Sequence, residues 1–135
     1  MERKTVYEDA NLRLDFVEKG KYLHETWWGR TPGEVFAKLL KIIVEKLNEF
    51  GADGMIIDAR EHKGLGPDSQ KLAAEAMANY AKEHGKLKEA IMVPKDVFSK
   101  FSVENYSKKV DEEESPVETK FFESLTKAEE WLQLE

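Results

Sequence analysis

The chain has 135 residues, which suits a single domain spanning residues 1–135. Its 21 Lys and Arg residues and 27 Asp and Glu residues give a net charge of −6, which argues against nucleic-acid binding through a basic patch. The chain has no cysteine, which excludes disulfides, thiolate metal sites and a cysteine nucleophile. No apolar run approaches the ~20 residues of a membrane span, so we expect a soluble, cytoplasmic protein.

Short strands are predicted over the first 28 residues. Apolar and polar residues alternate over residues 12–16, which is the pattern of a strand with one buried face. A Lys-Gly pair at residues 19–20 predicts a turn into a second strand over residues 21–28, and a weaker strand over residues 5–7 precedes both. The domain therefore opens with an antiparallel hairpin.

Two adjacent tryptophans lie in the second strand of this hairpin. Side chains alternate between the faces of a strand, so Trp27 and Trp28 point to opposite faces. We expect Trp28 to lie exposed, in one row with Tyr22 and His24, and to contact a partner subunit or a ligand, because tryptophan is enriched among interface residues. Trp27 then packs inside. The alternative is that both indoles belong to an ordinary core.

The helix expected over residues 32–50 has the clearest boundaries. Thr31 and Glu34 form a capping-box pattern around Pro32, which predicts that Thr31→Ala costs about 1 kcal/mol of stability. Apolar residues then recur at helical spacing, and Gly51 stands where a left-handed C-terminal cap is expected.

Strands and helices alternate over the rest of the chain. Further strands are expected at residues 54–58, 87–93 and 117–122, and further helices at residues 67–84, 96–110 and 125–132. Pro67 and Ser124 mark helix starts, and the acidic run with a proline at residues 111–116 predicts an exposed loop. This order predicts an α/β fold with about four helices and a mixed sheet, in which the hairpin extends parallel strands.

Several segments together carry a resemblance to a known family. They are the Thr-Pro-Gly-Glu helix start at residues 31–34, the run Met-Ile-Ile-Asp-Ala-Arg at residues 55–60, residues 90–94, and the ending from Phe121 to Leu132. In this pattern the chain resembles small bacterial STAS-like proteins, whose fold is that of the SpoIIAA-like anti-sigma-factor antagonists, over nearly its whole length. The resemblance implies a regulatory domain that binds a protein partner, although a fold does not determine function.

In the antagonists that the chain resembles, a kinase phosphorylates a serine in an Asp-Ser-Ser-Gly motif at the start of a helix. The matching stretch, residues 61–69, keeps Asp68 and Ser69 but lacks the second serine and the glycine. Ser69 is therefore a candidate phosphorylation site, because a helix N-terminus favours a phosphate. The alternative is that both residues only cap the helix.

Charged side chains gather where the strand over residues 54–58 ends, at the sheet edge where open α/β folds bind ligands. Asp58 and His62 are candidates for acid–base chemistry, and Arg60 is a candidate clamp for an anion. The alternative is a charged rim in which an Asp58–Arg60 pair orders the turn. The three histidines share no ligand spacing, so we expect no metal and no cofactor.

Three functions are therefore considered. The first is a non-enzymatic domain that binds a protein partner, a second copy of itself, or a small apolar or anionic ligand. The second is a carrier of an apolar ligand or lipid, as in the CRAL-TRIO class, and a closed apolar pocket between sheet and helices would favour it. The third is an enzyme that uses Asp58 and His62, which requires the two side chains within hydrogen-bond reach.

Overall fold

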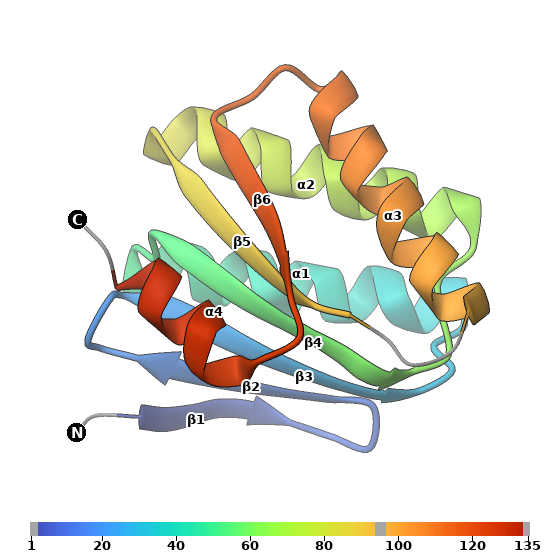
Figure 1. Ribbon diagram of the computed structural model, residues 1–135, viewed down its shortest axis with the longest axis horizontal. Helices are drawn as coiled ribbons and strands as arrows, with labels where there is room; N and C mark the ends of the chain where they lie inside the picture. Colours follow the sequence, from blue (N-terminus) through green and yellow to red (C-terminus); the bar gives the residue numbers. More distant parts are fainter. Residues whose placement is uncertain (1–2, 94–96, 134–135) are drawn as a thin grey trace.

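A mixed sheet of six strands organises residues 3–93 and 97–133, which are the residues that the computed structural model describes. The strands follow one another across the sheet in chain order, as Figure 1 shows. They are β1 (Arg3–Glu8), β2 (Leu12–Val17), β3 (Tyr22–Gly29), β4 (Gly54–His62), β5 (Leu87–Met92) and β6 (Val117–Phe122). β1 to β3 pair antiparallel and β3 to β6 pair parallel, which confirms the predicted mixed sheet.

Four helices of the described residues pack on the two faces of this sheet. They are α1 (Gly33–Phe50), α2 (Pro67–His84), α3 (Val97–Glu112) and α4 (Leu125–Leu132). Apolar residues of α1, α2 and α3 form the larger core with one face, and α4 forms a smaller core with the other, where it lies in front of the sheet in Figure 1. Within this described part of the chain, none of the helices joins the length to the apolarity that crossing a bilayer requires.

A β-bulge near the carboxyl end of β4 decides which side chains reach the larger core. Thr26 pairs with Asp58, but Trp28 pairs with Glu61, so two steps along β3 match three steps along β4. In a regular strand Ala59 and His62 would face opposite sides of the sheet. With the extra residue, both line one cavity in the larger core.

The predicted capping box at the start of α1 is wrong. The helix begins at Gly33, and Pro32 takes the cap position without a side-chain hydrogen bond; its carbonyl accepts from the Phe36 N–H at 2.8 Å. Thr31 instead turns inward and is buried, and its Oγ1 lies 3.2 Å from Nε2 of His62. The hydroxyl therefore links the start of α1 to the end of β4.

The other helix ends follow the sequence closely. Gly51 adopts φ +58° after α1, Pro67 opens α2, and the Ser124 hydroxyl accepts from the Lys127 N–H at 3.3 Å. α3 continues to the second residue of the acidic run, so the loop begins at Glu113.

The expectation of an exposed row on β3 is correct for one residue and wrong for two. Trp28 is 37% exposed and Trp27 only 5%, which confirms that they point to opposite sides. Tyr22 and His24, however, are buried. The reason is α4, which packs on this face and brings Glu129 to the Tyr22 hydroxyl, whose O–H donates to Oε2 at 3.1 Å.

Candidate functional site

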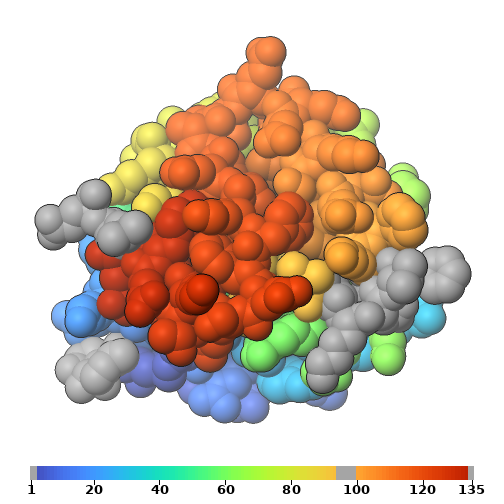
Figure 2. All heavy atoms as spheres, viewed as in Figure 1, coloured from blue at the N-terminus to red at the C-terminus, as the bar shows by residue number. Residues whose placement is uncertain are grey.

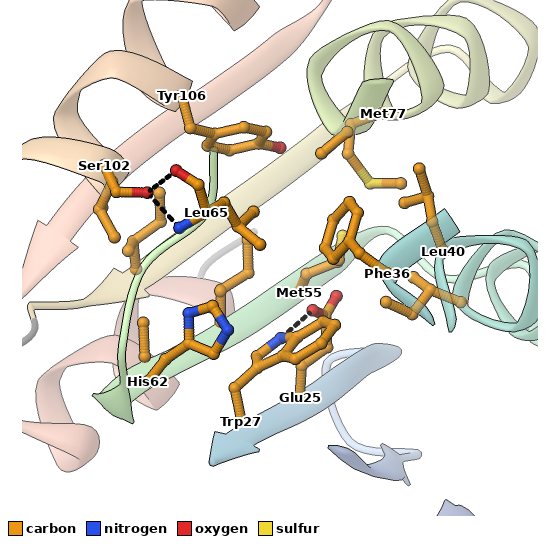
Figure 3. Close-up of a pocket in the computed structure, with 16 residues that line it drawn as sticks. Glu25, Trp27, Phe36, Leu40, Met55, His62, Leu65, Met77, Ser102 and Tyr106 are labelled. Carbon is orange, nitrogen blue, oxygen red and sulfur yellow. Dashed lines mark hydrogen bonds between the residues drawn. The ribbon is translucent and has the colours of Figure 1, made fainter. Parts of the chain in front are cut away.

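A cavity of about 80 Å³ lies in the larger core, between the sheet and helices α1, α2 and α3 (Figure 3). This volume is several times what a single water molecule needs. Most of its lining is apolar and comes from the helices and the central strands, including Phe36, Leu40, Met55, Met77 and Ile91. Such an apolar cavity with a few polar side chains is the usual form of a small-molecule site.

Glu25 of β3 is the unusual member of this lining, because it is a carboxylic acid only 3% exposed. The indole N–H of Trp27 donates to Glu25 Oε1 at 2.9 Å, as Figure 3 shows, whereas Oε2 has no hydrogen-bond partner. Burial, together with the nearby charge of Glu89, raises the pKa of Glu25 to about 8, although the Trp27 hydrogen bond opposes this. Glu25 is therefore mostly protonated at neutral pH.

Glu89 of β5 is a second buried acid of the larger core, and both of its oxygens have partners. The Tyr106 hydroxyl donates to Oε2 at 2.7 Å, and the Thr119 hydroxyl donates to Oε1 at 3.3 Å. Burial raises the pKa of Glu89 to about 7, and the two hydrogen bonds oppose the rise. Tyr106 lines the cavity, but its hydroxyl is thus already used.

His62 forms part of the cavity wall as a neutral imidazole. The Gly64 N–H points to Nδ1 at 3.2 Å, so Nδ1 accepts, and Nε2 carries the proton that it donates to Thr31 Oγ1. Burial lowers the pKa of His62 to about 4. The ring meets Trp27 edge-on, with 5.5 Å between the ring centroids. Both ring nitrogens are therefore used in holding the fold together.

Ser102 of α3 binds the loop between β4 and α2 through hydrogen bonds to Leu65. Its Oγ accepts from the Leu65 N–H at 2.7 Å and donates to the Leu65 carbonyl at 3.0 Å, both drawn in Figure 3. Gln70 adds a bond from its side-chain amide to the same carbonyl at 2.7 Å. Because Leu65 and Ser102 both line the cavity, these bonds close its wall on the loop side.

Asp58 and Arg60 form an ion pair, which is the alternative to acid–base chemistry given in the sequence analysis. Arg60 donates from Nε to Oδ1 at 2.9 Å and from its terminal nitrogen to Oδ2 at 2.7 Å. Burial opposes ionisation of Asp58, but the Arg60 hydrogen bonds outweigh it and hold the pKa of Asp58 below its usual value. The bulge turns His62 to the other side of β4, so Asp58 and His62 lack the mutual hydrogen-bond reach that the enzyme alternative requires.

The structure gathers other predicted residues into a polar cluster on the α4 face of the sheet. Arg3 lies 3.0 Å from Nδ1 of His24 and 3.0 Å from Asp15, and it also reaches Glu129, the partner of Tyr22. Nε2 of His24 is buried without a partner. The cluster holds the edge of α4 to the first three strands.

Ser69 lies in the first turn of α2 and is only 8% exposed. A Cβ built on Gly33 would come within 3.7 Å of its Oγ, so the hydroxyl faces the start of α1. Phosphorylation of Ser69 stays a prediction, and it requires the start of α2 to move away from α1.

No group of three or more His, Asp or Glu side chains within residues 3–93 and 97–133 is placed to hold a metal ion. The sequence reasoning missed Glu25 as a site residue. The signal was present, since Glu25 stands between Leu23 and Trp27 in the inward row of β3, where an acid has no evident partner.

Among the solved structures that resemble this fold, two match nearly the whole chain. One is an uncharacterized protein of Shewanella loihica PV-4, described as a DUF3478 family protein with a SpoIIAA-like fold; it matches with a TM-score of 0.53 and 20% identity over 98% of this chain and 96% of its own. SiaC of Pseudomonas aeruginosa matches with a TM-score of 0.55 and 13% identity over 90% of this chain and 100% of its own. No protein-family model and no curated sequence matches the chain. The chain therefore has the SpoIIAA-like fold that its sequence pattern predicted.

Proposed function

We propose that this protein is a non-enzymatic binding domain that takes up a small, largely apolar molecule in the cavity between the sheet and helices α1 to α3. The observation that carries the proposal is the cavity itself, whose lining is apolar except for a few side chains. Met55 and Met77 lie on opposite sides of it, on β4 and α2, and their flexible thioethers adapt to ligands of different shape.

The position of Trp28 favours this function over a partner surface on the hairpin. A docking surface built on β3 needs several aromatic side chains side by side. Tyr22, the aromatic residue expected beside Trp28, is covered by α4. Contact of Trp28 with a protein partner or a second copy is thus supported by one exposed indole alone.

The partners of Asp58 and His62 favour binding over catalysis. A general base needs a free basic atom near a reacting group. Asp58 is held by Arg60, and His62 uses one ring nitrogen for Thr31 and the other for Gly64.

The proposal is tested with methionine methyl groups as reporters of the cavity. Protein labelled with ¹³C at the methionine methyls is titrated with 2-methylbutane and followed by NMR. We expect the signals of Met55 and Met77, which line the cavity, to shift saturably, while that of Met92, buried in the core under α4, stays in place. The proposal fails if 2-methylbutane moves neither Met55 nor Met77.

A matched pair of variants on α2 locates the binding. Ala73 lines the cavity, so Ala73→Leu fills it and abolishes the 2-methylbutane shifts. Asn79→Leu places the same side chain on the exposed side of the same helix and leaves them unchanged. Equal loss in both variants would assign the shifts to a change in α2 rather than to occupancy of the cavity.

A further inference from the structure

The unpartnered oxygen of Glu25 indicates what kind of molecule the cavity takes. Buried polar atoms in folded proteins nearly always have a hydrogen-bond partner, and each exception requires an explanation. Glu25 Oε2 is such an exception, and it belongs to a side chain that lines the cavity. A ligand in the cavity is therefore the natural partner of this atom.

The direction of the missing hydrogen bond follows from the one that is present. Since the Trp27 N–H donates to Oε1, that oxygen is the acceptor of the carboxyl group. Burial keeps Glu25 protonated near neutral pH, so the proton resides on Oε2. Oε2 is then a hydrogen-bond donor without an acceptor.

The other polar side chains of the lining are already engaged. His62 bonds with Thr31 and Gly64, Ser102 bonds with Leu65, and the Tyr106 hydroxyl bonds with Glu89. Among residues 3–93 and 97–133, those that line the cavity include neither Lys nor Arg. An anionic ligand group would therefore find no counter-charge there, and a cationic group would find one carboxyl and little else to replace its water shell.

We propose that Glu25 is the polar anchor of this cavity, and that its Oε2–H donates a hydrogen bond to the carbonyl oxygen of an uncharged, otherwise apolar ligand such as a ketone or an ester. This inference rests on the proposed function and names the ligand class that the same cavity selects. Trp27 acts as a positioning residue, because its N–H fixes which oxygen of Glu25 accepts and which is free.

Three probes that share a butane chain and differ in the group on carbon 2 test the inference near neutral pH. Butan-2-one carries the carbonyl oxygen, 2-methylbutane has a methyl group in its place, and butan-2-amine has an ammonium group. Dissociation constants come from the Met55 and Met77 methyl shifts, with Met92 as the internal control.

Two substitutions of Glu25 separate the hydrogen bond from the shape of the cavity. Glu25→Gln keeps an acceptor for Trp27 and a donor toward the cavity, so we expect butan-2-one to bind within about threefold of its wild-type affinity. Glu25→Met removes the donor, and we expect the affinity for butan-2-one to fall about tenfold or more while 2-methylbutane binds as before. Unchanged binding of 2-methylbutane also shows that the variant keeps its cavity.

The remaining outcomes overturn the inference in distinguishable ways. If Glu25→Met lowers the affinities for butan-2-one and 2-methylbutane equally, or changes neither affinity, Glu25 does not anchor the carbonyl, although the cavity still binds apolar molecules. If butan-2-amine binds more tightly than butan-2-one and Glu25→Gln weakens it, Glu25 is the counter-ion of a cation instead. If no probe moves Met55 or Met77, the proposed function fails together with the inference.

Discussion

Glu25 and Glu89 lie on the same face of the sheet, yet their carboxyl groups are satisfied differently. Glu89 has a partner for each oxygen, from Tyr106 and Thr119, whereas Glu25 has one partner and faces the cavity. A buried polar atom without a partner is costly, so a purely structural carboxyl would be expected to look like Glu89. Because Glu25 lacks the second partner that Glu89 has, we expect the partner of Glu25 to come from outside the chain.

The buried acids make the stability of the protein depend on pH. The pKa of Glu25 is raised from an ordinary value of 4.5 to about 8, so the folded state holds a proton that the unfolded state releases. The stabilisation is complete below the unfolded pKa and is lost as the pH rises through the folded pKa. The lowered pKa of His62 has the opposite effect on stability, because it destabilises the fold as the pH falls below about 6.5. The change in stability between about pH 6.5 and about pH 8 therefore reports on the buried acids.

Glu25→Gln should remove most of this dependence, because glutamine does not titrate. Between about pH 6.5 and about pH 8 we expect the wild type to lose about 1 to 2 kcal/mol more of its unfolding free energy than the variant. Urea denaturation at both pH values measures this. Glu61→Gln, at an exposed position, is the control and should follow the wild type. Equal losses in wild type and Glu25→Gln would mean that Glu25 ionises normally in the folded state.

At the scale of elements, the start of α1 and the end of β4 are joined by the Thr31–His62 hydrogen bond. A double-mutant cycle distinguishes this bond from a helix cap. Thr31→Val keeps the shape but leaves the His62 Nε2–H without its acceptor, which we expect to cost about 1 kcal/mol. In a His62→Phe background the same substitution should cost clearly less. If its cost is the same in both backgrounds, Thr31 stabilises α1 independently of His62.

The order and type of the elements could be predicted because they depend on local patterns. The alternation over residues 12–16, the apolar run at residues 54–58 and the helical periodicity after Pro32 each involve neighbouring residues only. The bulge in β4 could not be predicted in this way, since it exists only in the pairing of Thr26 and Trp28 with the next strand. That one extra residue separates Asp58 from His62 and puts His62 beside the cavity.

The burial of Tyr22 and His24 escaped prediction for a related reason. Whether a face of β3 is covered depends on where α4, more than 100 residues later, packs. The alternation of side chains on β3 was correct, and Trp27 and Trp28 separate as expected. Both faces are nevertheless covered over most of β3, because α4 packs on the second face, and no local pattern encodes that contact.

At the scale of the whole molecule, the two faces of the sheet are packed differently. Under α4 the packing is tight, since a Cβ on Gly54 would lie 2.8 Å from a methyl carbon of Leu132. On the side of α1 to α3 the core instead leaves a cavity of about 80 Å³. Protein cores are normally filled to the density of organic crystals, so the apolar cavity between the sheet and α1 to α3 favours a binding role for that face. Met92 in the α4 core therefore serves as an internal control when ligand binding is followed through Met55 and Met77.

The most direct test of the binding function is a crystal structure of the protein under xenon pressure. Xenon enters dry apolar cavities and is located without ambiguity by its anomalous scattering. We expect a xenon atom among Phe36, Met55 and Met77, and none in the core under α4. A cavity that contains only ordered water, or a core that has closed around Glu25 without space for xenon, would contradict the proposal that this fold holds a small apolar molecule.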